Sequence, residues 1–363
     1  MIVLILLAVS PILVKLIMEW VQPNDKLTLK SQKKYDKIFL IICGILITLI
    51  MGLRGRKSGS LDTNMYCKFF SDVARNNNLR SYLAKQIEGE IFLFSEVGFS
   101  LFMWLLSRIT VEPQALIFTT SAFIVYSTMR FIYKNSDDVF LAVILFLCLG
   151  LFTFNMNGMR QAMAMSICLW AYEFAKNKKP VKFLLLVLVA TLFHKTAIVF
   201  LLVYFIKYLK FNTKSMLFLI TLFIIIAVLN PVIVKYFDDI YDKSYSESES
   251  RTGGGIIQLA IYLGTVLLAI VARKSLSDDA GKDCFYLLLL ALYFFILRYI
   301  GTQIFERISY YFAYFLILML PKTIKHAERK EKPVLMFLSI FLSIGLFIYR
   351  VNGNFSNFYL CFI

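Results

Sequence analysis

The chain has 363 residues, of which 59% are hydrophobic and 17% charged, and its net charge at pH 7 is +16. Its mean hydropathy of +0.72 is more apolar than a soluble core of this size can bury, which excludes a soluble domain and indicates a polytopic membrane protein. The apolar runs are continuous rather than alternating, so we expect helices and not an outer-membrane barrel. Lysine and arginine lie in short loops between these runs, which indicates membrane topology and argues against nucleic-acid binding.

About a dozen apolar segments follow one another along the chain, and we expect one all-α transmembrane bundle over residues 1–363. The first segment lacks a basic n-region and an evident cleavage site, so it is predicted to be a retained helix rather than a signal peptide. About 11 or 12 membrane segments are expected, some of them broken or re-entrant. In chain order they are 2–20, 38–53, 92–109, 116–133, 140–154, 159–175, 183–193 with 196–206, 216–234, 256–272, 285–300, 308–320 and 334–349.

The basic residues predict which loops face the cytoplasm, because short cytoplasmic loops carry excess lysine and arginine. Segments 54–90 and 235–255 are then expected outside, and a reversal at His194 keeps both neighbouring basic loops inside. Two full crossings between residue 90 and Lys134 would leave the loop after Lys134 on the wrong side, so we expect a half-crossing between residues 92 and 133. The loops expected inside are 22–37, 176–182, 207–214, 273–283 and 321–333.

Arg160 stands between two long apolar segments, where an ionised group costs at least ~2.5 kcal/mol and usually marks a function. On a helix, Asn157, Arg160 and Gln161 share one face. The planar fork of a guanidinium suits a phosphate or diphosphate better than an ammonium does. A salt bridge that locks two helices is the alternative interpretation.

Arg307 repeats this pattern, because Glu306 precedes it and Tyr310 and Tyr311 follow at helical spacing. Tyrosine rings stack on sugars and their hydroxyls add directional hydrogen bonds, so this stretch is a candidate glycan site. Tyrosines are also common anchors at the membrane interface, which is the alternative for these two.

Two arginines, Arg54 and Arg56, are expected just outside the membrane, against the usual charge trend, and indicate an anionic ligand. Asp62 is a candidate general base or a group that orients an arginine, and Tyr66 lies one helical turn later. A solvated loop is the alternative. An imidazole such as that of His194 titrates near neutrality and can act as base or donor, although a lone histidine at a helix break is more often a structural hydrogen-bonding residue.

Neither a metal nor another cofactor is expected. The six cysteines form no C-x-x-C pair, and no histidine stands near them at ligand spacing. The only glycine cluster, 253–255, directly precedes an apolar segment and is predicted to be a loop end rather than a phosphate-binding loop.

Several short motifs occur in order along the chain. They are Arg56-x-x-Gly59-x-x-Asp62-x-x-x-Tyr66, Glu96-x-Gly98-Phe99, Asn157-x-x-Arg160-Gln161-x-x-Ala164, Leu192-Phe193-His194-Lys195-Thr196-Ala197 and Glu306-Arg307-x-x-x-Tyr311-Phe312 running to Leu320-Pro321. Together they resemble the EpsG-like branch of bacterial Wzy-type O-antigen and exopolysaccharide (capsular) polymerases. The first motif departs from the family at two points: Ser60-Leu61 occupies positions where the family tends to have Gly-Thr, and Arg54 offers a second register for the first arginine.

The resemblance implies a bundle of the general character of GT-C glycosyltransferases, in the bacterial cytoplasmic (inner) membrane, with its active site facing outward. It implies an inverting, metal-independent transfer of a growing glycan from polyprenyl (undecaprenyl) diphosphate to a lipid-linked repeat unit. Its implied partners are the lipid-linked oligosaccharide, membrane lipid, a chain-length regulator and a flippase. Two other functions stay open: a flippase or transporter of lipid-linked oligosaccharide, and a glycosyltransferase that uses polyprenyl-phosphate sugars.

The candidate residues divide into two groups by expected role. Asp62, His194, Arg160 and Arg307 are the catalytic candidates, in which the arginines clamp the diphosphate and Asp62 or His194 serves as the base. The substrate-binding candidates are Arg54, Arg56, Tyr66, Glu96, Asn157, Gln161, Arg298, Glu306, Tyr310 and Tyr311.

Overall fold

The structure is a computed structural model that describes residues 1–21, 28–56, 58, 61–75, 78–87, 96–206, 209, 212–232, 235, 255–299, 303–354 and 358–361. Over these residues it is helical, and the β-type pairing is an isolated bridge between Arg54 and Leu360. In the described ranges five helices are long and apolar enough to cross a membrane, or up to seven if each of two bent pairs is one span. The predicted polytopic all-α bundle with broken segments is confirmed.

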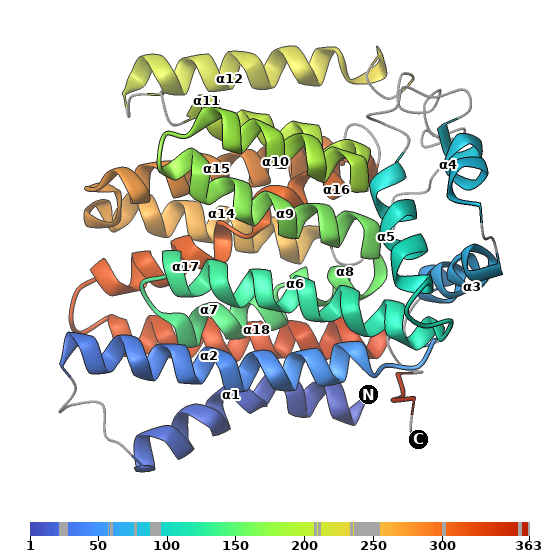
Figure 1. Cartoon of the computed structure of the whole chain (residues 1–363). Helices are drawn as coiled ribbons and strands as arrows, with labels where there is room; N and C mark the ends of the chain where they lie inside the picture. The colour runs from blue at the N-terminus through green and yellow to red at the C-terminus, as the bar shows by residue number, and fades with distance from the viewer. Residues whose placement is uncertain are drawn as a thin grey trace. The chain divides into compact units, whose positions relative to one another are not determined.

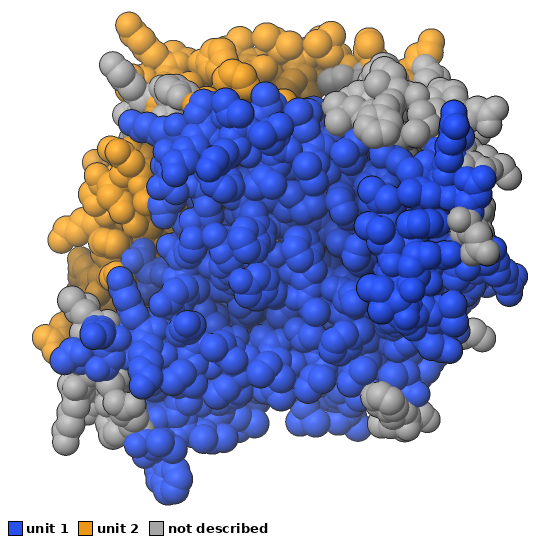
Figure 2. Space-filling model, in the orientation of Figure 1, with its two compact units in different colours: residues 1–198, 333–363 blue, residues 199–332 orange. Residues whose placement is uncertain are grey.

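The chain divides into two compact units, coloured separately in Figure 2. Unit 1 comprises residues 1–198 and 333–363, and unit 2 comprises residues 199–332. The candidate residues divide with them: Arg160 and His194 belong to unit 1, whereas Arg298 and Arg307 belong to unit 2.

Six helices that run alongside one another form most of unit 1 (Figure 1). Helix α2 packs against α6, α6 packs against α9, and α9 packs against α10, while α1 lies on α2. Each of these helices is formed by a continuous apolar run that ends in a polar or glycine-containing turn, as the sequence predicts. Their bounds are α1 Ile2–Val21, α2 Leu29–Gly52, α6 Pro113–Asn135, α9 Met159–Lys176, α10 Pro180–Phe193 and α18 Lys332–Asn354.

Three shorter helices, α3 (Leu61–Arg75), α4 (Leu79–Ile87) and α5 (Val97–Ser107), lie at one end of unit 1 (Figure 1). At 11 residues, α5 is about 16 Å long, which is roughly half of a hydrocarbon core. It therefore has the length of the half-crossing that the loop charges require. Residues 91–95, where a longer span was expected to begin, lie outside the described residues.

The two ends of unit 1 carry different basic residues: mostly arginines at the end with α3 to α5, and mostly lysines at the other, which we call the basic end. The end with α3 to α5 also carries the last residues of α2 and α10 and the first residues of α6 and α9 (Figure 1). At the opposite end, Lys134 at the end of α6 lies 3.4 Å from Glu173 of α9. The lysines of the α2 start and of the α9–α10 turn gather at this basic end: Lys30, Lys33, Lys34, Lys37, Lys176, Lys178, Lys179 and Lys182.

The expected span 140–154 is bent by 51° into α7 (Val139–Cys148) and α8 (Leu151–Asn157). Gly150 at the bend has φ +99°, a conformation that favours glycine. A Cβ at this position would overlap the guanidinium of Arg350. The glycine therefore allows the sharp bend that a continuous apolar run does not reveal.

The arginine segment after α2 is held by residues 358–361. The backbone N–H of Gly55 donates to Tyr359 O at 2.9 Å, and Cys361 N donates to Leu53 O at 2.8 Å. The Ser58 hydroxyl adds bonds to both backbone groups of Tyr359. Gly55 has no room for a side chain, because a Cβ there would overlap the Tyr359 ring.

Unit 2 is a smaller helical unit that has its own aromatic core. Phe312 lies between Phe200 and Phe294, with ring centroids 6.0 and 5.9 Å away. The expected span 308–320 is instead a pair bent by 46°, and the expected outer segment 235–255 lies outside the described residues except at its two ends. The elements are α11 Leu202–Ile206, α12 Thr213–Val228, α14 Gly255–Val271, α15 Asp279–Leu297, α16 Gln303–Ala313 and α17 Leu316–His326, with 3-10 helices η3 Lys195–Leu201 and η5 Arg273–Leu276.

Candidate functional site

Tyr66, Glu96, Arg160 and His194 meet at the end of unit 1 opposite the basic end, and we name them the Glu96 cluster. Glu96 is its centre: one carboxylate oxygen accepts a hydrogen bond from His194 Nδ1 at 2.6 Å, and the other pairs with Arg160 Nη1. The backbone N–H of Lys195 adds a longer bond of 3.4 Å to the first oxygen. One buried carboxylate thus binds two side chains that stand far apart in sequence.

The ends of two helices position the basic residues of this cluster. His194 follows the last residue of α10 in an extended conformation, so its ring leaves the helix axis. Arg160 is the second residue of α9, which begins after Gly158. The positive end of the α9 dipole therefore adds to the charge of Arg160 and favours an anion at this point.

Glu96 itself has φ 54° and ψ 26°, the left-handed region that non-glycine residues seldom occupy. Such a conformation costs about 1 to 3 kcal/mol and persists where surrounding contacts determine it, often at functional sites. Gly98, two residues later, permits the close approach of α5 to α10, since a Cβ on Gly98 would lie 3.0 Å from the backbone of Leu192 on α10. The Glu96-x-Gly98 motif thus has a physical role: it seats α5 against α10 and brings the carboxylate to His194.

Tyr66 supports the other side of Arg160. Its hydroxyl accepts a hydrogen bond from Arg160 Nε at 3.2 Å, and the guanidinium lies 5.6 Å from its ring centroid. The edge of Phe99 packs on the same ring at 5.6 Å, so α5 fixes Tyr66 as well as Glu96. Asp62, in the first turn of α3, stands one helical turn before Tyr66 and is half-buried.

The cluster buries its negative charge and exposes its positive charge. The Glu96 side chain is 8% exposed, whereas that of Arg160 is 36% exposed. A guanidinium that is fixed by a carboxylate and a phenol and is 36% exposed can offer its exposed part to an anionic ligand. The arrangement can therefore bind an anion beside an imidazole that is able to accept a proton.

The structure separates the two arginines of the first motif. Arg54 is fully buried, and its guanidinium donates to the carbonyls of Met51 and Met156 and to the Ser121 hydroxyl. Arg56 is exposed, and its partner is Glu112 at 3.5 Å. Arg54 thus joins α2, α6 and α8, while Arg56 is the one that a ligand can reach.

The Met156 carbonyl, three residues before the start of α9, connects Arg54 to that helix start. It accepts hydrogen bonds from Arg54 at 2.7 Å and from Thr63 at 3.3 Å. Asn157 comes next, and its side-chain oxygen is buried with no hydrogen bond among the described residues. Gln161, one residue after Arg160, is 3% exposed. Arg54 therefore positions the backbone that delivers Arg160.

A comparison with protein families decides what kind of chain carries this site. The model of the EpsG family matches residues 37–361, a range that includes the whole Glu96 cluster. The chain belongs to the EpsG family. This membership supports a membrane protein of the polysaccharide-polymerase type. Comparisons with curated proteins and with solved structures give no match.

Unit 2 of this EpsG family protein holds a second group, the Glu306 cluster, made of Arg298, Glu306 and Tyr310. Arg298 follows α15, and its Nη1 lies 2.8 Å from Glu306 Oε2 at the start of α16. The Tyr310 hydroxyl donates to the other oxygen of Glu306 at 3.4 Å. Arg307 is exposed beside this group, whereas Tyr311 is 1% exposed and belongs to the core.

The structure brings four sequence candidates of unit 1 into direct contact in the Glu96 cluster and three of unit 2 into the Glu306 cluster. Three further candidates are close in sequence to members of the first cluster: Asp62 precedes Tyr66 by four residues, and Asn157 and Gln161 flank Arg160. The physical reading of the sequence gave Glu96 no role of its own, and the family motif alone named it. A carboxylate at the head of the short apolar run 97–107 was the available signal. Ser121 and Thr63, which fix the Arg54 network, carry no such signal because single hydroxyls are common in helices.

Proposed function

We propose that this protein is a polysaccharide polymerase that transfers a growing glycan from undecaprenyl diphosphate to a lipid-linked repeat unit. The transfer is inverting and metal-independent, and it takes place at the outer face of the bacterial cytoplasmic membrane. The observation that carries the proposal is the Glu96 cluster, in which a buried carboxylate fixes a part-exposed arginine at a helix N-terminus beside a histidine. Membership of the EpsG family supports the proposal that the product is a polysaccharide.

The reaction breaks the bond between the anomeric carbon and the diphosphate oxygen, and forms a bond from that carbon to an acceptor hydroxyl. Negative charge grows on the departing diphosphate, and a fixed guanidinium stabilises it in the transition state. We assign this role to Arg160, with help from Arg56, which is exposed in the same unit. Loss of one such donor costs on the order of 10²–10³ in rate.

The acceptor hydroxyl loses its proton as the new bond forms. His194 is our first choice of base, because the hydrogen bond from Nδ1 to Glu96 orients the ring and stabilises its protonated form. The proton then passes to Nε2, the other ring nitrogen. Asp62 is the second choice, since it lies at the start of α3 in the same part of the chain as Tyr66.

The lysines of the basic end support the proposed location at the outer face. The basic end of unit 1 is expected to face the cytoplasm by the positive-inside rule, and the Glu96 cluster lies at the opposite end (Figure 1). We further propose that Tyr66, Asn157, Gln161 and Tyr310 contact sugars. A chain-length regulator and a flippase are proposed partners.

The decisive experiment uses purified full-length protein in detergent with synthetic lipid-diphosphate repeat units and a metal chelator. Product length is followed on gels for the wild type, for Arg160→Ala, and for Arg75→Ala, a surface arginine of α3 whose side chain is 83% exposed. We expect a ladder of polymer from the wild type and from Arg75→Ala, and none from Arg160→Ala.

Other outcomes identify the competing functions. Movement of lipid-linked glycan across vesicles by folded protein that makes no ladder would establish a transporter. Addition of single sugars from a polyprenyl monophosphate donor would establish the other glycosyltransferase class. Either result overturns the proposal.

A further inference from the structure

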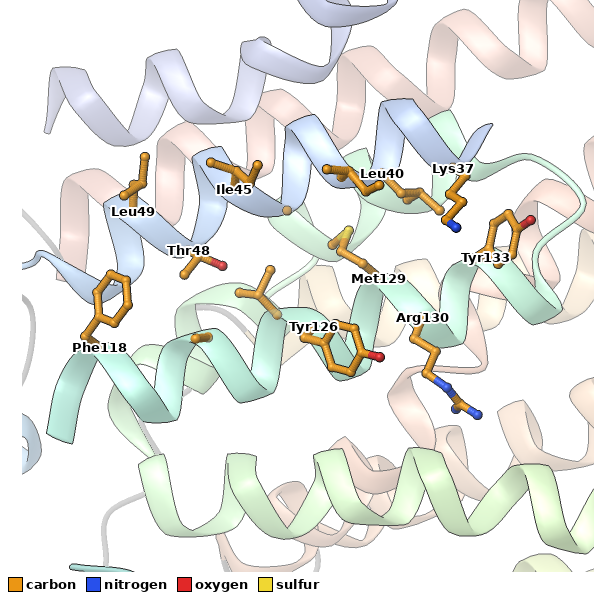
Figure 3. Close-up of a pocket in the computed structure, with 14 residues that line it drawn as sticks. Lys37, Leu40, Ile45, Thr48, Leu49, Phe118, Tyr126, Met129, Arg130 and Tyr133 are labelled. Atoms are coloured by element: carbon orange, nitrogen blue, oxygen red, sulfur yellow. The ribbon is translucent and has the colours of Figure 1, made fainter. Parts of the chain in front are cut away.

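A groove runs between α2 and α6 on unit 1, and no residue of the Glu96 cluster lines it. Its volume is about 520 Å³, and both walls are largely apolar. Figure 3 shows Leu40, Ile45 and Leu49 on the α2 side and Phe118 and Met129 on the α6 side. The groove lies entirely within one unit, so its geometry is that of two helices packed together.

Small residues make the groove and exposed apolar residues border it. Gly44 and Ala122 line it, and a Cβ at Gly44 would lie 3.3 Å from Met129 Cγ, so a larger residue there would fill the space. Ile45 is 55% exposed and Tyr126 is 60% exposed. Apolar surface that is exposed on membrane-spanning helices faces lipid, and a groove in it gives a lipid chain a defined place.

The two ends of the groove differ in charge. Lys37, Arg130 and Tyr133 lie at one end, and Leu49 and Phe118 lie at the other (Figure 3). The guanidinium of Arg130 stacks 3.8 Å above the Trp170 ring, and the indole N–H of Trp170 donates to Ser127 at 3.0 Å. A cation held this way is positioned in advance for an anion, because its aromatic support is itself fixed.

We propose that this groove binds one anionic phospholipid, with its phosphate at Lys37 and Arg130 and one acyl chain between α2 and α6. The stretch from Lys37 to Leu49 covers about 18 Å of helix. This is close to half of a hydrocarbon core of ~30 Å, so the groove has the depth of one leaflet. Lys37 and Arg130 lie at the basic end of unit 1, and the lipid therefore belongs to the leaflet at that end.

The charge at the ends also distinguishes this ligand from a polyprenyl diphosphate. A donor lipid with its diphosphate at Arg160 would enter from the opposite end, where the groove offers Leu49 and Phe118 and no cation. The inference is independent of the proposed reaction, because it rests on another pair of helices and on different cations.

The experiment measures retention of phosphatidylglycerol and phosphatidylcholine by the full-length protein in detergent, using native mass spectrometry and lipid titration. We expect one tightly held phosphatidylglycerol in the wild type. Lys37→Ala with Arg130→Gln removes two cations and should weaken its binding on the order of tenfold. The control, Lys30→Ala with Lys33→Ala, removes two cations at the same end outside the groove lining and should leave binding unchanged.

A second variant tests the groove without changing charge. Ala122→Leu fills it and should release the lipid, whereas Gly345→Leu on α18, where a Cβ meets nothing within 4 Å, should not. Equal losses in the cation pair and its control would show general attraction to anionic lipid and overturn the proposal. Preference for a polyprenyl phosphate, or a stable dimer that occludes the groove, would overturn it as well.

Discussion

The Glu96 and Glu306 clusters both pair an arginine with a glutamate near a helix start, but they bury opposite charges. In the Glu96 cluster the glutamate side chain is 8% exposed and its arginine 36%. In the Glu306 cluster the arginine is 7% exposed and the glutamate 23%. The first presents a cation to a ligand, and the second encloses its cation and leaves the carboxylate more accessible.

The difference in exposure indicates that Arg160 and Arg298 have different roles. Arg160 is fixed from behind and can stabilise an anion, whereas Arg298 is surrounded by Glu306, Phe295 and Tyr299 and holds α15 to α16. Arg307, exposed beside the second cluster, is a cation of unit 2 that a ligand can reach. An arginine–glutamate pair is therefore the proposed ligand site in unit 1, whereas in unit 2 such a pair joins two helices.

The largest expected effect comes from removing each carboxylate. Glu96→Gln leaves Arg160 and His194 beside a neutral amide and should lower the free energy of unfolding by about 3 to 5 kcal/mol. Glu306→Gln affects one cation at a more exposed site, and about 2 kcal/mol is expected. Thermal unfolding in detergent measures both, and an equal or larger shift for Glu306→Gln would contradict the comparison.

Arginine-to-lysine changes separate binding from structure. Arg160→Lys keeps the charge but loses the planar fork, and we expect the rate of polymer formation to fall on the order of 10²-fold with folding retained. Arg298→Lys should lower the unfolding midpoint while the rate stays within a factor of ten. Gel assays and thermal scans of the same preparations check this, and full-length polymer made by Arg160→Lys at the normal rate would refute the clamp.

Two glycines provide a matched test of packing beside the clusters. In Gly98→Ala the new methyl group meets the backbone of Leu192 at 3.0 Å, and about 1 to 3 kcal/mol of destabilisation is expected. In Gly255→Ala it meets the hydroxyl end of the Tyr299 side chain, which can move, so less than about 1 kcal/mol is expected. The unfolding midpoints of the two variants measure this difference. A larger loss in Gly255→Ala than in Gly98→Ala would show that α5 shifts more easily than the Tyr299 side chain.

The smallest effect is expected at an exposed ion pair of unit 2, Asp278 with Lys322 at 2.9 Å. Burial alone would raise the pKa of Asp278, but hydrogen bonds from Lys322 and the Gly281 N–H lower it on balance. The pair therefore stabilises the fold above the ordinary aspartate pKa of about 3.9, and this contribution is lost as the pH falls below it.

Asp278→Asn keeps the helix cap and removes the charge, so it should cost less than about 1 kcal/mol at pH 7. The unfolding midpoints of wild type and variant should approach each other in high salt and as the pH falls below about 3.9. A difference that stays constant over this fall in pH would assign the effect to the cap instead.

The sequence predicts the membrane class and most helix positions because long apolar runs have one stable arrangement in lipid. It also marks Arg160 and His194, since polar residues inside such runs are rare. It does not predict the bend at Gly150, because the apolar run continues across it and only the backbone conformation shows the need for glycine. The short α5 was suggested by loop charge rather than by its own composition.

The contacts within the site were less predictable. Arg54 and Arg56 are two residues apart and chemically identical, yet one is fully buried and the other exposed. Their difference depends on Ser121 and Met156, which are distant in sequence and ordinary in type. The meeting of Glu96 with His194 likewise depends on how α5 packs on α10, a tertiary fact that no local pattern contains.

The pairing of residues 53–58 with 358–361 has a consequence for biosynthesis. Tyr359 leaves the ribosome 301 residues after Ser58, its hydrogen-bond partner. During membrane insertion the backbone groups of the nascent arginine segment therefore bond to water or headgroups until residues 358–361 have been made. The segment that carries Arg54 and Arg56 is completed only then, so shorter nascent chains lack a finished site.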